Sequence, residues 1–215
     1  MKRLSLLILG AGLIGLLVWA IANSNTQSMT SSESPAVGVA DWASQAVTVA
    51  DEVAEADLIV RAKVTDVNQV RKLRQVLPRY SSDGKIDGEG VNIMPFTDSE
   101  MAVLEVYKGS VEQEITVMQT GGALPAENGD PAMNLVTFDD PLFVAGSEHI
   151  LFLTDISGDP VHSQGRKLYR AINPAGRYEI RGTTVFSPSE FPATYNPPKT
   201  GDELVGQIKQ ALASR

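Results

Sequence analysis

The sequence predicts a mainly β fold, a small antiparallel barrel or sandwich with a short N-terminal helix and a C-terminal helix packed on the sheet. Short segments with alternating apolar side chains recur along the chain, and Gly, Pro or Asn residues bound them. No strong amphipathic helix separates one segment from the next. Because parallel strands need such crossover helices, we expect antiparallel pairing.

The composition is that of one acidic, cysteine-free domain with extensions. At about 150 residues per domain, 215 residues indicate one domain rather than two. The apolar fraction of 43% is enough for one sizeable core. With 18 basic and 26 acidic residues the formal net charge is −8, which disfavours nucleic acid as a partner. The absence of cysteine excludes disulfides, thiolate metal sites and cysteine nucleophiles.

The first 22 residues have the pattern of an export segment. Lys2 and Arg3 precede an uncharged run over residues 4–21. This run is longer than the apolar segment of a cleaved signal peptide usually is, and it is just long enough to span a bilayer. The small-x-small pattern that ends at Ala22, however, suits cleavage by signal peptidase. Residues 1–22 are therefore expected to be a signal peptide or an N-terminal membrane anchor. The protein is then a single-pass protein of the cell membrane with its C-terminal domain outside, or it is secreted if the leader is cleaved.

A flexible polar tether is expected after the leader, over residues 23–47. Its first part, 23–35, is rich in Ser, Thr and Asn and has one charge, so it cannot repay the entropy of ordering. The folded domain is expected over residues 48–215.

The domain is expected to begin with a helix over residues 48–56, with Val49 and Val53 on its apolar face and Glu52 elsewhere on the turn. Residues 58–67 alternate as a strand does, whereas the basic and then Gly-rich stretch 71–90 indicates a long connection. A second long connection is expected over residues 120–147. Further strands are expected over residues 101–107, 114–119, 148–155, 167–172 and 177–180.

The C-terminal residues carry a helix signal. Thr200 and Glu203 form a capping box, and an apolar stripe follows that includes Leu204 and Ile208. We expect this helix to cap the sheet by ordinary packing, with partner binding as the alternative.

The order of several sequence blocks resembles a known type of domain. The blocks are ADLIVRAKVTDV, VYKGS, EITVMQTGG, EHILFLTD and AGRYEI, within residues 56–181. They are similar to the OB-like barrel of netrin modules and tissue inhibitors of metalloproteases, and to exported bacterial proteins of unassigned function. The resemblance implies an OB-like β-barrel. The N-terminal cysteine with which the animal inhibitors chelate the protease zinc has no counterpart here, so inhibition by that route is not implied.

Two segments are candidate binding surfaces. A basic cluster, Arg71, Lys72, Arg74 and Arg79, could contact an anionic wall polymer or an acidic partner, or could be a solvated extension of a strand. The aromatic and proline-rich segment 187–198 contains Phe191 and Tyr195. These two side chains could form a contact surface, or could strap the segment down over the sheet.

No catalytic residue, metal site or cofactor is predicted. His149 and His162 lack a metal-ligand spacing, and no serine lies in a nucleophile motif. The loop from Asp83 to Glu89 is similar to a calcium loop, but Lys85 and Met94 stand where oxygen ligands are needed. An irregular calcium site and a plain hairpin tip remain as alternatives.

The sequence therefore favours an exported, membrane-tethered, non-enzymatic binding or interaction module. Its expected contacts are the membrane, through residues 4–21, and an extracytoplasmic protein or an anionic polymer. One alternative is a structural envelope protein. The other is an extracytoplasmic hydrolase that uses the carboxylates of the second long connection, which are Glu127, Asp130, Asp139 and Asp140.

Overall fold

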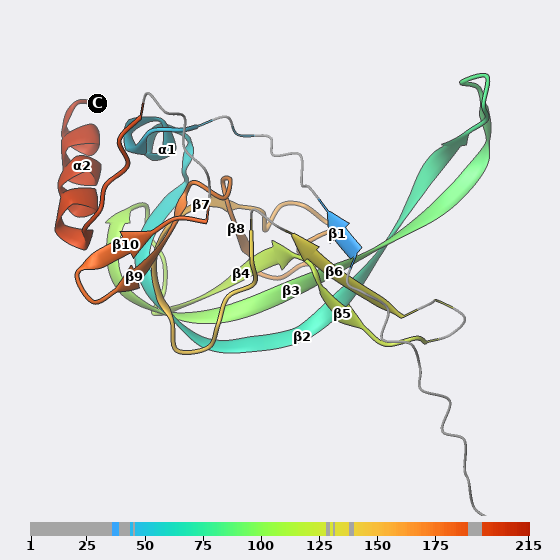
Figure 1. Cartoon of the computed structure of the whole chain (residues 1–215), viewed down its shortest axis with the longest axis horizontal. Helices are drawn as coiled ribbons and strands as arrows, with labels where there is room; N and C mark the ends of the chain where they lie inside the picture. Colours follow the sequence, from blue (N-terminus) through green and yellow to red (C-terminus); the bar gives the residue numbers. More distant parts are fainter. Residues whose placement is uncertain are drawn as a thin grey trace, which may run out of the picture. The chain divides into compact units, whose positions relative to one another are not determined.

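The fold is mainly β, as the sequence predicts, and has one short helix before the main sheet and one helix at the C-terminus (Figure 1). The structure is a computed structural model. All of the residues that it describes lie in one compact unit, Ser34–Arg215. The leader, 1–22, lies outside these residues, and none of the helices that are described is long and apolar enough to cross a membrane. The described residues are 36–38, 44, 46–127, 130, 132–137, 140–188 and 195–215.

The helices are α1 (Val49–Glu55) and α2 (Gly201–Ala213). The strands are β1 (Ala36–Gly38), β2 (Leu58–Tyr80), β3 (Ile86–Lys108), β4 (Glu114–Thr120), β5 (Gly122–Leu124), β6 (Met133–Thr137), β7 (Glu148–Asp155), β8 (Tyr169–Ala171), β9 (Arg177–Arg181) and β10 (Thr184–Phe186).

The described strands form two sheets. The larger has the order β10-β9-β7-β2-β3-β4-β8, with β8 also paired to β7, and the smaller has the order β1-β6-β5. The larger sheet is not a clear barrel, because β4 and β8 meet at a single residue pair, Val117↔Tyr169. Residues 36–38, which the sequence assigns to the tether, form β1.

Antiparallel pairing holds for most but not all strand pairs. β4 pairs with β8, and β1 with β6, in parallel. The expected antiparallel pairing does not extend to these two pairs, because they are joined through long irregular connections that contain other strands. Such connections can bring two strands into parallel contact without a crossover helix.

The prediction of a long connection over residues 71–90 was also wrong. β2 and β3 are each 23 residues long and pair with each other throughout, with several register shifts. The turn between them contains Gly84 in the left-handed region, at φ 78°. The sequence concealed this hairpin because a ribbon exposed on both faces needs no apolar periodicity.

The two helices lie side by side and cover one end of the sheet (Figure 1). α2 begins at the predicted cap, where the Thr200 hydroxyl accepts from Glu203 N, and α1 is capped in the same way by Thr48, whose hydroxyl accepts from Asp51 N, each at 3.2 Å. Glu52, expected off the apolar face, is instead fully buried. It is one helical turn from Val49 and adjacent to Val53, so the α1 surface that meets the core includes a carboxyl group.

The core lies on both faces of β2, because neighbouring residues of a strand point to opposite sides. Ile59 packs with the helices, in a cluster that includes Val53 and Ile208. Val60 packs on the other face with Val117 and residues of β7. The start of β2, at residues 58–60, is thus buried on both sides, whereas from Arg61 to Thr65 its residues alternate between buried and more exposed positions.

Candidate interaction surface

The β2–β3 hairpin has a covered base. In this hairpin base, residues 70–74 and 93–97, Leu73 packs against Leu168 on one face. On the other face β5 approaches so closely that a Cβ on Gly122 would lie 2.6 Å from Val70 Cγ2. The base is therefore part of the folded body.

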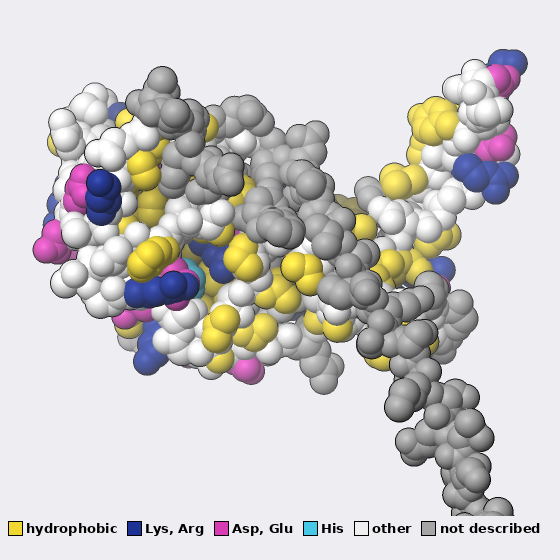
Figure 2. Space-filling model, viewed as in Figure 1, with side chains coloured by type: hydrophobic (Ala, Val, Ile, Leu, Met, Phe, Trp, Pro, Cys, Tyr) yellow, Lys and Arg dark blue, Asp and Glu magenta, His cyan; other side chains and the backbone are white. Residues whose placement is uncertain are grey.

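The distal hairpin, residues 76–91, is exposed by contrast. No residue of this segment is buried. Figure 2 shows hydrophobic side chains along the projecting ribbon. The exposed large hydrophobic side chains of the segment are Val76 (60% exposed), Leu77 (39%), Tyr80 (62%), Ile86 (65%) and Val91 (54%). These exposed apolar side chains on a projecting ribbon make the segment the candidate interaction surface.

Three of the four predicted basic residues lie in the hairpin base, and each has an acidic partner there. Arg71 donates to Asp98 through two nitrogens, at 2.6 and 2.9 Å. On the opposite face Lys72 and Arg74 lie 2.9 and 3.0 Å from Asp130 Oδ2. The hydrogen bond from Lys72, and then the charge of Arg74, lower the pKa of Asp130.

The fourth, Arg79, lies on the distal hairpin, where its Nε is 2.9 Å from Asp87 Oδ1. The structure thus spreads the basic cluster over two faces of the hairpin and pairs every member with a carboxylate. A cation that already has such a partner attracts an external anion less strongly.

The two aromatic candidates are not brought to the hairpin. Phe191 lies outside the described residues. Tyr195 is half-buried beside α1, where its hydroxyl accepts a hydrogen bond from Val49 N at 3.3 Å. This position agrees with the alternative in which Tyr195 straps its segment to the body of the fold.

The carboxylates of the second long connection lie in different surroundings. Asp140 is buried in an ion pair with Arg177 and also accepts from Gln119 Nε2 at 3.0 Å. Asp130 binds the hairpin base, and Glu127 is largely exposed, with its Oε2 3.8 Å from Lys72 Nζ. Asp139 lies outside the described residues. A glycosidase-type acid needs a raised pKa, whereas the pKa of Asp130 is lowered.

The suspected calcium loop is the hairpin tip. Asp83 lies 3.0 Å from Lys85 Nζ, and Asp87 is paired with Arg79. Within the described ranges no group of three or more His, Asp or Glu side chains could hold a metal ion.

The two histidines lie apart. His149 is buried, and burial and then the nearby charge of Arg177 lower its pKa to about 4. Its Nε2 lies 2.8 Å from Ser147 Oγ, and that hydroxyl donates to a main-chain carbonyl at 2.6 Å. His162 Nδ1 lies 2.6 Å from Asp159 Oδ2.

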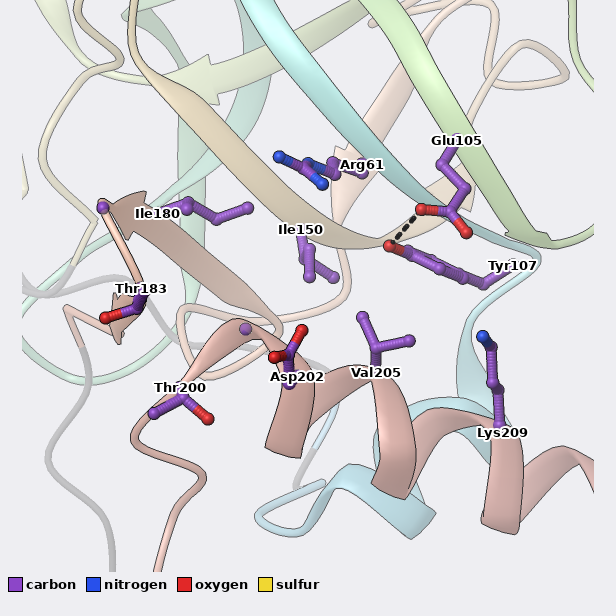
Figure 3. Close-up of a pocket in the computed structure, with 12 residues that line it drawn as sticks. Arg61, Glu105, Tyr107, Ile150, Ile180, Thr183, Thr200, Asp202, Val205 and Lys209 are labelled. Atoms are coloured by element: carbon purple, nitrogen blue, oxygen red, sulfur yellow. Dashed lines mark hydrogen bonds between the residues drawn. The ribbon is translucent and has the colours of Figure 1, made fainter.

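A pocket of about 430 Å³ lies between α2 and the larger sheet (Figure 3). Ile150, Ile180 and Val205 give it apolar walls. At its sheet side the Tyr107 hydroxyl donates to Glu105 at 2.9 Å. Burial, and then the hydrogen bond to Glu105, raise the pKa of Tyr107.

The charged groups at this pocket are of both signs. Arg61 forms an ion pair with Glu148, which raises the pKa of the guanidinium. Asp202 and Lys209 line the α2 side and are exposed. The pocket therefore has no single charge that would select a cationic or an anionic ligand.

Sequence reasoning missed the exposed apolar residues of the distal hairpin. The available signal was the Asp83-Gly84 dipeptide, a common hairpin turn, between two stretches that contain β-branched residues such as Val76 and Val91.

In comparisons with known proteins the chain matches no family model and no curated protein.

Proposed function

We propose that this chain is a non-enzymatic binding module that contacts a protein partner through the distal hairpin. The observation that carries the proposal is the exposure of Val76, Tyr80, Ile86 and Val91 on two strands that the other described elements leave uncovered. An isolated two-stranded hairpin is at best marginally stable in water. Cover by another molecule would remove these apolar side chains from water and stabilise the ribbon.

We place the module outside the cytoplasm. The support is the charge pattern of the leader, with Lys2 and Arg3 before the uncharged run 4–21. The run holds the chain in the membrane, or cleavage after Ala22 releases it.

A protein partner is better supported than an anionic polymer. Binding to a polyanion depends on cations that are free to pair with it. Arg71 and Lys72 are instead engaged with Asp98 and Asp130. The distal hairpin itself has Arg79 and Lys85 against three acidic residues, so its charge does not favour an anionic ligand.

The hydrolase alternative has less support than the binding module. Of its proposed carboxylates, Asp130 and Asp140 are held in ion pairs by basic residues. No specific observation favours the structural envelope protein.

We also propose that the larger sheet is an OB-like barrel of the netrin-module type. The support is that β8 pairs with both β4 and β7, which links β7, β2, β3, β4 and β8 in a closed ring of pairings. In such a barrel the distal hairpin would be an extension of two neighbouring barrel strands.

The test is site-specific photo-cross-linking of the full chain in its native cell envelope. p-Benzoylphenylalanine replaces Ile86, or in a matched control Val144, which is 69% exposed on another loop. We expect a discrete protein adduct at Ile86 that is absent at Val144. An adduct with polysaccharide, no adduct, or equal protein adducts at both positions would contradict the proposal.

A further inference from the structure

The distal hairpin has two outer edges, and one contact in the hairpin base determines which backbone groups face them. The Pro95 carbonyl accepts a hydrogen bond from Gly121 N at 2.9 Å, on the side of β3 that faces away from β2. Residues 70–79 pair with residues 88–97 without a register shift. In such an antiparallel ladder every second residue pair turns its N–H and C=O groups outward.

The backbone groups that face outward therefore belong to every second residue pair, counted from the pair that contains Pro95. Those pairs are Lys72↔Pro95, Arg74↔Ile93, Val76↔Val91 and Pro78↔Glu89.

The outer edge of β3 is open along the distal hairpin and at Ile93, the neighbouring residue of the hairpin base. At residues 96–102 this edge is occupied by β4. β4 ends at Thr120, and Gly121 and Gly122, at φ 119° and 127°, turn the chain away. Beyond that point no described residue pairs with the edge of β3, and within the described ranges no hydrogen bond occupies the N–H groups at Ile93, Val91 and Glu89, which an incoming strand could therefore accept from.

The outer edge of β2 is interrupted. Pro78 occupies one of its outward-facing positions and has no N–H to donate. Proline at such positions blocks edge-to-edge pairing in natural sheets. Of the two edges, that of β3 is therefore the one built to accept a strand.

The side chains along this edge indicate what the incoming strand carries. Val91 and Ile93 point to one face of the ribbon, and Gly88 and Gly90 lie on the other. A Cβ added at Gly90 would meet nothing closer than 3.9 Å, whereas one at Gly88 would lie 3.2 Å from Arg79 Nη2, so the room for a large side chain on this face is at Gly90. A strand with apolar or β-branched residues at every second position complements this pattern.

The small area of the apolar face argues against face-to-face packing of a second copy of this chain. The exposed face over residues 76–80 is about 17 Å long at about 3.4 Å per residue, and it is two strands wide. The corresponding area is on the order of 200 Å², well below the roughly 800 Å² per partner that a stable interface buries. Strand addition differs because main-chain hydrogen bonds supply affinity that the area does not.

We infer that an extended segment of another protein, apolar at alternate positions, binds the distal hairpin by pairing with the outer edge of β3 at Ile93, Val91 and Glu89. The inference rests on the proposed function and specifies how the partner is bound.

Two proline substitutions on opposite edges test it. Val91→Pro removes an outward N–H from β3, and Val76→Pro removes one from β2, while neither removes a hydrogen bond between the two strands. The cross-linker stays at Ile86 in the full chain in the native envelope. Loss of one main-chain hydrogen bond should reduce the yield of the protein adduct about five-fold or more with Val91→Pro. With Val76→Pro the yield should be unchanged.

The remaining outcomes separate this inference from the proposed function. An adduct that persists equally in both proline variants, or is lost only with Val76→Pro, overturns strand addition at β3 and leaves a protein-binding hairpin. An adduct with a second copy of the chain overturns the partner class. Absence of any adduct when the cross-linker is at position 86 and no proline substitution is present overturns both the inference and the proposed function. If Val91→Pro unfolds the chain on thermal denaturation, Glu89→Pro makes the same test at the next outward position.

Discussion

The hydroxyl oxygen of Tyr178 lies 3.4 Å from Glu52 Oε2, in a site where neither residue is more than 1% exposed. Burial raises the pKa of Glu52 to about 8, and this effect outweighs the hydrogen bond from Tyr178, which lowers it. The charge of Asp51 on the same helix raises it further. Near neutral pH the Glu52 carboxyl group is therefore mostly protonated.

Glu52→Gln should increase stability in alkaline solution. Because the folded pKa is raised above the ordinary value of 4.5, the contribution of Glu52 is fully present below pH 4.5 and is lost as the pH rises through about 8. Because a shift of one pKa unit corresponds to about 1.36 kcal/mol, the free energy of unfolding falls by an amount on the order of 3–5 kcal/mol over this range. We expect the thermal midpoint of the variant to exceed that of the parent at pH 8.5 and to depend less on pH between 5 and 8. Glu55→Gln, an exposed change on the same helix, is the control. A pH slope equal to that of the parent would exclude this role for Glu52.

His149→Gln should reduce the loss of stability in acidic solution. The pKa of His149 falls from 6.5 to about 4 in the fold, so its contribution is present above pH 6.5 and is lost as the pH falls toward 4. The change amounts to about 3 kcal/mol. Measured by urea unfolding at pH 7.5 and 4.5 in a Glu52→Gln background, the variant should lose less stability on acidification than its parent. An equal loss in both would refute the assignment.

The buried ion pair between Asp140 and Arg177 should be costly to break from one side. Both side chains are nearly inaccessible, so Asp140→Asn leaves an uncompensated guanidinium and should destabilise the fold by about 3–5 kcal/mol. Replacing both, with Asp140→Leu and Arg177→Met, should recover much of that loss. Glu179→Gln, in an exposed pair with Arg181, should cost at most about 1 kcal/mol. Urea unfolding of the three variants measures these values, and a double variant no more stable than Asp140→Asn would contradict the pairing.

The sequence predicted those elements whose signals are local. β7 runs from Glu148 to Asp155, as expected, because a continuous apolar segment between turns suffices to identify it. α2 begins at the predicted Thr200 cap because the capping box is a pattern of four residues.

What the sequence did not predict depends on contacts that only the fold creates. A buried Glu52 looks like any solvated helix residue until Tyr178 is packed against it, 126 positions later. The cations Arg71 and Lys72 formed an apparent free cluster because their partners lie 27 or more positions away. The distal hairpin was missed for the opposite reason, since strands that are exposed on both faces leave no burial pattern.

The most direct test of the central claim is removal of the distal hairpin. Residues 76–91 are replaced by Asn-Gly, which joins Gln75 to Asn92, a pair that faces inward in the ladder and suits a two-residue turn. Full-length parent and variant are extracted in mild detergent and compared by native electrophoresis and thermal unfolding. We predict that the parent migrates in a larger complex, that the variant does not, and that the thermal midpoint shifts by less than about 4 °C. An unchanged complex in a variant that folds as stably as the parent would contradict the account.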